Sequence, residues 1–170
     1  MKDTVNLAGI IHESLNNGPG IRRVLFAQGC KHNCKACFNP HTHGFGGGQD
    51  YRVQELVNDI KRNPLISGVT FSGGDPLEQG EAFAEIAEES KKCNKNVWCY
   101  TGYKFEYIME NADKIPGWNK LINNIDVLVD GKFDIEKKDE DLKYRGSRNQ
   151  RIIDVKESLK NNKIIEFKLT

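Results

Sequence analysis

Short apolar runs that alternate with amphipathic helical segments constrain the fold of this chain more than any other feature of its sequence. Such runs suit strands that are buried on both faces of a sheet. Strands that alternate with helices form βαβ units, which predicts an α/β fold with a mostly parallel sheet. About five strands are too few for a closed eight-stranded barrel, so we expect an open, partial (βα) barrel. The predicted strands are 24–26, 69–71, 97–100, 127–129 and 164–167.

Helical periodicity fills the segments between these strands. In the clearest segment, apolar residues recur at i, i+3, i+4 and i+7: Val53, Leu56, Val57 and Ile60. This spacing places them on one face of a helix. We expect Asp50 to cap its amino end, because aspartate accepts hydrogen bonds from the first free N–H groups, and Pro64 to stop it. Shorter apolar stripes at 83–87 and 105–109 predict two further helices.

Length and charge set broad limits on the function. A chain of 170 residues is predicted to form one domain, 1–170. The 25 basic and 24 acidic residues nearly balance, so nucleic acid and anionic membranes are not expected partners. No apolar run approaches the roughly 20 residues that span a bilayer, and the first residues lack an apolar signal core. We therefore expect a cytoplasmic protein.

Three of the five cysteines crowd into a short segment directly after the first predicted strand. Cys30, Cys34 and Cys37 have the spacing C-x3-C-x2-C, whereas Cys93 and Cys99 lie apart. An odd number and a tight group argue against a disulfide framework and for metal binding. Three thiolates can hold three irons of a [4Fe–4S] cubane, which leaves the fourth iron open for a ligand. Cys99 lies in an apolar run and is expected to be a small core residue.

A zinc site is the alternative at this point. His41 follows Cys37 at the spacing C-x3-H, so the three cysteines and this histidine could form a structural Cys3His site. The cysteine spacing alone leaves both interpretations open.

Several further segments extend the pattern along most of the chain. The cysteine spacing is the signature of the radical S-adenosylmethionine superfamily. More closely, the chain resembles the activating proteins of anaerobic ribonucleoside-triphosphate reductases, which are glycyl radical activases. The similar segments appear in the same order: 17–20 with Arg22, 25–39, 72–77, 98–103, and 127–133 followed by 145–150. Each segment alone is a weak signal, and together they are specific.

The resemblance implies a [4Fe–4S] cluster on Cys30, Cys34 and Cys37, and S-adenosylmethionine as the second cofactor. It also implies cofactor contacts from Ala36, Cys37 and Phe38. Many members of the superfamily place an aromatic residue just before the third cysteine. Here that position is Ala36 and the aromatic residue is Phe38, which leaves open which of the two packs near the adenine.

A glycine pair follows the second predicted strand, in the segment Ser72, Gly73, Gly74 and Asp75. Two glycines allow the backbone to approach a ligand closely, although a plain strand-to-helix turn with proline at the helix start would look the same. The resemblance implies that these four residues bind the ammonium group of the methionine part. The cofactor carboxylate would meet Lys132, and Asp130 would hold Lys132 or a cation. The role of 145–150 does not follow from the sequence.

The implied activity is that of an oxidoreductase. A low-potential electron donor reduces the cluster, S-adenosylmethionine is cleaved reductively, and the resulting radical takes a hydrogen from a glycine in the large subunit of the anaerobic reductase. Two alternatives remain at this point: an activase of another glycyl radical enzyme, such as a formate-lyase type, and a non-enzymatic zinc or electron-transfer module.

Overall fold

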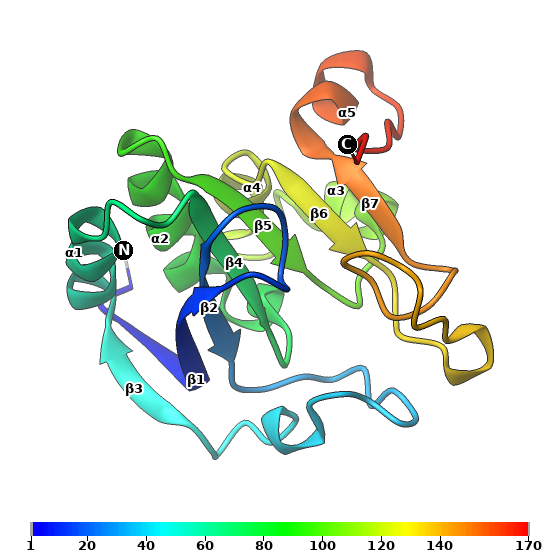
Figure 1. Ribbon diagram of the computed structural model, residues 1–170, viewed down its shortest axis with the longest axis horizontal. Coiled ribbons are helices and arrows are strands. Elements are labelled where there is room, and N and C mark those ends of the chain that lie inside the picture. The colour runs from blue at the N-terminus through cyan, green and yellow to red at the C-terminus, as the bar shows by residue number, and fades with distance from the viewer. Residues whose placement is uncertain (1, 170) are drawn as a thin grey trace.

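The computed structural model describes residues 2–169, which fold around one open sheet of seven strands (Figure 1). The strand order is β3-β1-β2-β4-β5-β6-β7. The four central strands, from β2 to β6 in that order, pair in parallel, and the outer strands pair antiparallel. The strands are β1 (Thr4–Ser14), β2 (Arg22–Ala27), β3 (Gln49–Arg52), β4 (Gly68–Gly73), β5 (Asn96–Tyr100), β6 (Val127–Asp130) and β7 (Arg151–Asp154).

The predicted α/β class and the open sheet are thus confirmed, but the sheet is mixed rather than mostly parallel. The partial barrel stays a prediction. The prediction of a last strand at 164–167 is wrong. This segment lies beside β7, with one bridge between Ile153 and Glu166 and backbone bonds on either side of it, but it does not form a regular strand.

Five α-helices and three short 3-10 helices connect the strands. Within 2–169, no helix is both long enough and apolar enough to cross a membrane. The predicted cap at Asp50 is wrong, because Asp50 lies in β3, where it pairs with Asn6 of β1, and the helix begins at Val53, after Arg52. The helices are α1 (Val53–Arg62), α2 (Gly80–Lys92), α3 (Phe105–Asn111), α4 (Trp118–Ile122) and α5 (Val155–Asn161), with η1 (Pro40–Thr42), η2 (Pro76–Gln79) and η3 (Ile135–Lys137).

The two faces of the sheet are covered differently. Successive strand residues point to opposite faces, so Leu128 joins the large core under the helices, whereas Val127 and Val129 join a smaller cluster on the other face. That smaller cluster contains Trp98, which packs edge-on against Phe167 from the end of the chain. Cys99 is fully buried, as expected for a core residue. The helix-free face is therefore covered by loops, which leaves room for a cavity.

A buried arginine ties the amino ends of three strands together. Arg22 in β2 is 0% exposed, and its guanidinium donates to Thr70 Oγ1 and Val69 O of β4 and to Asn96 O of β5. It also lies over the ring of Trp98, 5.7 Å from the centroid. Burial lowers the pKa of Arg22 to about 10. The amino end of the sheet is thus closed by a polar network, and the loops that carry the candidate site lie at the opposite end.

Candidate functional site

The three clustered cysteines lie on a loop that leaves the carboxyl end of β2, and we call residues 28–39 the cysteine loop. Its start is fixed by backbone bonds, because Gly29 N–H donates to Thr42 O (2.6 Å) and Cys30 N–H donates to His43 O (3.2 Å). Asn33 and Ala36 adopt the left-handed conformation, with φ of 50° and 58°. Such residues cost free energy and are found where function requires a special loop shape.

Backbone N–H groups act on all three thiols, and Cys37 Sγ accepts a hydrogen bond from Asn39 N–H at 3.4 Å. Bonds of this kind stabilise a thiolate and tune the sulfurs of iron–sulfur clusters. Two donors belong to the cysteine loop, and the third comes from the chain after β6. The backbone groups are those of His32 and Phe133, which act to lower the pKa of Cys30 and Cys34, and that of Asn39 at Cys37.

The surroundings of the thiols favour a positively charged ligand. Burial raises the pKa of Cys30 to about 11 and also raises the pKa of Cys34. The Phe133 N–H and the charge of Lys132 partly oppose this effect at Cys34. A half-buried thiol that is hard to deprotonate on its own becomes a thiolate when it binds a metal. The donor set therefore fits a metal centre, with Lys132 close to it.

Across 2–169, no three side chains of histidine, cysteine, aspartate or glutamate converge on one metal position. Three ligands of one zinc ion must converge in this way. In a cubane each thiolate binds a different iron, so its sulfurs need not meet at one point.

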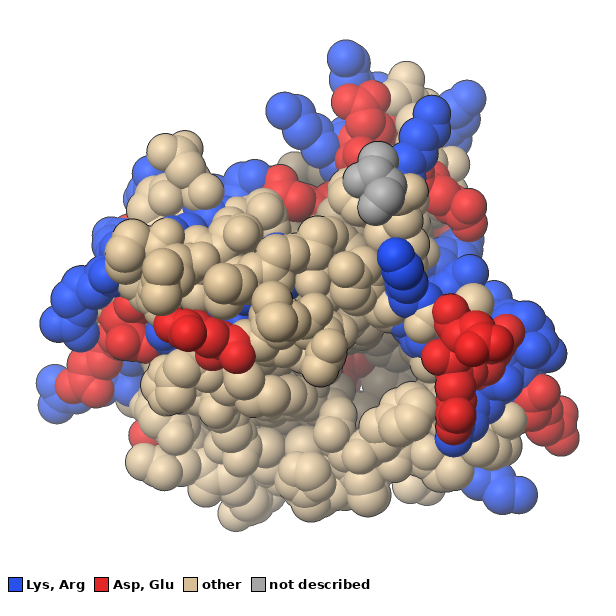
Figure 2. Space-filling model, in the orientation of Figure 1, with Lys and Arg blue, Asp and Glu red and all other residues tan. Residues whose placement is uncertain are grey.

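A cavity of about 530 Å³ lies beside the cysteine loop, over the helix-free face of the sheet. Its floor is formed by Phe26, Ser72 and Tyr100, at the carboxyl ends of β2, β4 and β5. Phe38 of the cysteine loop and Arg145 also line it. Figure 2 shows a hollow between the centre of the molecule and the charged loops that follow β6. Its volume lies within the usual range for small-ligand sites.

The segment 145–150 forms the outer wall of this cavity. Gln150 Oε1 accepts hydrogen bonds from the N–H groups of Gly146 (2.8 Å) and Ser147 (3.1 Å), and Gln150 Nε2 donates to Gly131 O (3.0 Å). The turn thereby closes on itself and is tied to the end of β6. A Cβ at Gly146 would lie 2.7 Å from the ring of Phe38, so the wall packs directly on the cysteine loop.

The glycine pair at the end of β4, Gly73 and Gly74, supports the cysteine loop. Gly73 has φ of 97°, which favours glycine, and a Cβ there would meet the backbone of β2. A Cβ at Gly74 would overlap Gly29 O and would lie 2.8 Å from Thr42 O. The close approach that these glycines permit is therefore to the backbone that carries Cys30.

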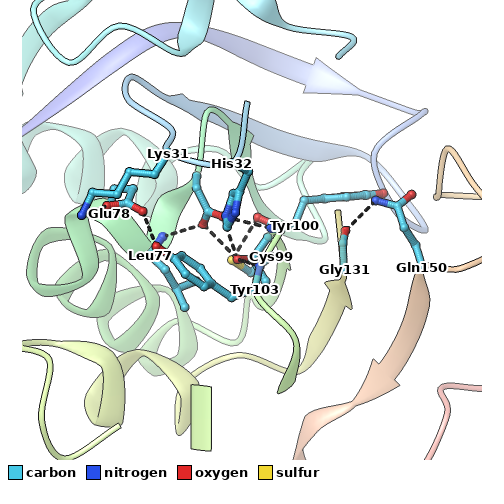
Figure 3. A network of polar contacts seen from close by, with 12 residues as sticks. Lys31, His32, Leu77, Glu78, Cys99, Tyr100, Tyr103, Gly131 and Gln150 are labelled. Atoms are coloured by element: carbon cyan, nitrogen blue, oxygen red, sulfur yellow. Dashed lines mark hydrogen bonds and ion pairs between the residues drawn. The ribbon is translucent and has the colours of Figure 1, made fainter. Parts of the chain in front are cut away.

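Asp75 points into the protein interior and is 0% exposed. Its carboxylate accepts from Leu77 N–H (3.0 Å), Thr101 Oγ1 (2.9 and 3.0 Å) and Gly102 N–H (2.9 Å), and lies 2.6 Å from His32 Nε2. Figure 3 shows this network, which joins the cysteine loop to the ends of β4 and β5. Asp75 lies outside the lining of the cavity that Ser72 and Phe38 share.

Asp130 and Lys132 line a second cavity, of about 660 Å³, together with His32 and Tyr103. Asp130 is 1% exposed and pairs with Arg151 (2.6 Å) rather than with Lys132, and it accepts a bond from Phe105 N–H. The cysteine loop contributes to both cavities, through Phe38 on one side and His32 on the other.

Comparison with known proteins identifies the family. Residues 16–153 match the family described as a 4Fe-4S single cluster domain. An anaerobic ribonucleoside-triphosphate reductase-activating protein from Haemophilus influenzae is 39% identical over 142 residues, which cover 79% of this chain and 88% of that protein. Proteins of the same name from phage T4 and Escherichia coli K12 are each 35% identical, over 80% and 79% of this chain and 85% and 88% of their own. The chain belongs to this activating-protein family.

Among solved structures, the chain is similar to QueE from Escherichia coli, with 15% identity and a TM-score of 0.46 over 58% of this chain and 53% of that one. A likeness at this level carries no functional argument. The 4Fe-4S family match decides between the metals, and it supports an iron–sulfur cluster over zinc.

For a member of the activating-protein family, the structure arranges the predicted residues in three groups. Cys30, Cys34 and Cys37 share one loop with Lys132 near it. Ser72 and Phe38 line the first cavity, whereas Ala36 is exposed and lies outside its lining. Gly74 and Asp75, just after β4, contact the backbone of the cysteine loop at Gly29. Sequence reasoning did not single out His32 or Arg151. The only signal for His32 is its place between two of the cysteines.

Proposed function

We propose that this chain, as a single domain, is a radical S-adenosylmethionine activase that generates a glycyl radical on the large subunit of the anaerobic ribonucleoside-triphosphate reductase. The observation that carries the proposal is the cysteine loop. Three thiols lie on one loop, which lines a cavity of about 530 Å³ through Phe38 and Asn39, in a chain of the activating-protein family.

Cys30, Cys34 and Cys37 would hold the [4Fe–4S] cluster. When bound and reduced by a low-potential donor, the cluster supplies one electron that splits S-adenosylmethionine into methionine and a 5′-deoxyadenosyl radical, which takes a hydrogen atom from a glycine α-carbon of the partner. The protein supplies binding, orientation and exclusion of water. The contribution of the protein therefore comes from the residues around the cysteine loop and the two cavities beside it.

Those residues have distinct proposed roles. Phe38 is 62% exposed and pairs with Phe133 at 4.7 Å, so its open face can stack on the adenine. Ser72 lines the first cavity at the end of β4, so it can meet the polar end of the cofactor there, and we assign the neighbouring Gly73 to the same end. Lys132 adds positive charge beside Cys34, where the cofactor carboxylate would lie. Asp130 would act through its ion pair with Arg151 at the edge of the second cavity.

The alternative of a different glycyl radical enzyme as partner is less well supported. The names of the three relatives above all specify the anaerobic ribonucleoside-triphosphate reductase. Incubation with that reductase and with a formate-lyase type enzyme separates the two alternatives.

Anaerobic reconstitution and electron paramagnetic resonance test the proposal. We expect about four irons per chain. With reductant, S-adenosylmethionine and the large reductase, a glycyl doublet should appear on the partner, and a partner whose radical glycine is replaced by alanine should give none. Replacing any cysteine of the loop by alanine should abolish iron binding and the doublet, whereas Cys99→Ala should keep both. Stoichiometric zinc without iron uptake, or a radical-free reductase, would refute the proposal.

A further inference from the structure

The carboxylate of Asp75 has no free acceptor position that faces a ligand. Oδ1 accepts from Leu77 N–H and Oδ2 from Gly102 N–H, the one hydroxyl hydrogen of Thr101 is shared between the two oxygens, and Oδ2 also contacts His32 Nε2. A carboxylate offers about four lone-pair sites, and these contacts occupy them. Because the side chain is also fully buried, an ammonium group would have to displace one of these protein donors.

The same residue holds the cysteine loop on both sides of Cys30. The N–H of Asp75 donates to Gly29 O at 2.9 Å, directly before Cys30. Its carboxylate contacts His32 Nε2 at 2.6 Å, two residues after Cys30. The backbone on either side of this cysteine is therefore tied to one residue at the end of β4.

The neighbouring residues are shaped to seat His32 in this position. A Cβ at Gly102 would lie 2.5 Å from His32 Cδ2, so the glycine makes room for the imidazole. Tyr103 packs edge-on against the same ring at 4.5 Å. Glu78 adds a second link to the loop, because it accepts from Tyr103 Oη at 2.5 Å and pairs with Lys31 at 3.4 Å. Figure 3 shows Lys31 and His32 reaching these partners from the same loop.

We propose that Asp75 is a positioning residue that fixes the cysteine loop around Cys30 through His32 and Gly29, and that it does not contact the ammonium group of the cofactor. The inference rests on the proposed function, because it concerns the cluster that this loop would hold. Groups that orient metal ligands from outside typically change metal affinity by about 10- to 100-fold when they are altered.

Two variants break the contact from opposite sides. Asp75→Asn keeps the shape but replaces one acceptor oxygen by a donor, which must then face the N–H of Leu77 or of Gly102. His32→Ala removes only one of the contacts to Asp75, so the fold should persist even where the first variant unfolds. His32→Gln can return a donor near the position of Nε2. Asp126→Asn is the matched control, because Asp126 accepts from Val97 N–H at the opposite end of the sheet.

The measurement is the rate of iron loss from the anaerobically reconstituted proteins to an excess of chelator, with folding checked by circular dichroism. Asp75→Asn and His32→Ala should lose iron about 10- to 100-fold faster than the wild type. His32→Gln should lie closer to the wild type than His32→Ala does, and Asp126→Asn should match the wild type. The dissociation constant for S-adenosylmethionine, measured by calorimetry on freshly loaded Asp75→Asn, should equal that of the wild type.

Two results would overturn the inference while the proposed function stands. One is wild-type iron retention in both Asp75→Asn and His32→Ala. The other is an Asp75→Asn variant that keeps its iron but no longer binds S-adenosylmethionine, which would make Asp75 a cofactor ligand. A wild-type protein that takes up no iron would overturn the proposed function and the inference together.

Discussion

A methyl group added at Gly74 should disturb the cysteine loop more than the cofactor. The Cβ of Gly74→Ala would overlap Gly29 O and would lie 2.8 Å from both Gly29 C and Thr42 O. All of these atoms are backbone, so no side chain can rotate away. Relief requires the segment before Cys30 to move away from β4, which breaks the bond from Asp75 N–H to Gly29 O.

The magnitude follows from these contacts. Overpacking costs about 1–3 kcal/mol, and the lost backbone bond adds about 0.5–1.5 kcal/mol. A loss of about 2–4 kcal/mol in the free energy of unfolding lowers Tm by roughly 5–15 °C for a chain of this size. Gly46→Ala is the matched control, since nothing lies within 4 Å of a Cβ there. It should be neutral or stabilising by up to about 1 kcal/mol, because alanine restricts the unfolded chain.

Thermal unfolding of the metal-free proteins and iron content after anaerobic reconstitution form the assay. Gly74→Ala should show both the lower Tm and reduced iron, and Gly46→Ala should show neither. A Gly74→Ala protein with wild-type Tm and a full complement of iron would refute the reasoning. If that protein had also lost affinity for S-adenosylmethionine, the glycine would serve the cofactor directly.

Three further predictions concern the side chains of Phe38, Trp118 and Arg22. Phe38→Ala should retain iron but weaken S-adenosylmethionine binding about tenfold or more in calorimetric titration, as expected for a lost base–aromatic stack. Leu65→Ala is the control, because Leu65 has the same 62% exposure, and it should leave the affinity unchanged. Trp118→Phe removes the donor to Leu77 O (2.8 Å) and should cost about 1–3 kcal/mol in urea unfolding. Burial lowers the pKa of Arg22 to about 10, so the folded chain releases this proton before the unfolded chain does. The unfolding free energy of the wild type should therefore rise relative to Arg22→Met as the pH climbs above about 10, and a flat difference would contradict this.

The central strands could be predicted because burial on both faces gives them continuous apolar runs. The edge strands could not. β3 (Gln49–Arg52) reads Gln-Asp-Tyr-Arg, and only its pairing with β1, more than 40 residues earlier, makes it a strand. The same pairing explains why Asp50 is a strand residue and not a helix cap. The prediction at the end of the chain failed in the opposite way. The apolar residues there suggested a strand, but Phe167 packs on Trp98, Ile164 packs on the large core, and the segment makes only one bridge to β7.

The cysteine loop could be predicted because the spacing of metal ligands is a local property of the sequence. The direction in which the Asp75 side chain points could not be predicted from the sequence. The segment from Ser72 to Asp75 reads the same whether the carboxylate faces a ligand or faces His32, which lies 43 residues earlier. Likewise, Asp130 precedes Lys132 by two residues, yet its partner is Arg151, which β7 brings alongside β6. Long-range pairing decides both cases, and it leaves no local pattern.

The position of Arg22 has a consequence for how such a scaffold can change over evolutionary time. Its hydrogen bonds hold three strands at one end of the sheet, while the cysteine loop and both cavities are built at the other. Mutations in the loops around the cavities leave these bonds intact, so they should alter which molecule is bound at little cost in stability. The loop before β2 is the exception, because Asn17 lines the first cavity and accepts a bond from Thr70, a partner of Arg22. Elsewhere around the cavities, new specificities can be sampled without the protein first having to acquire compensating, stabilising substitutions.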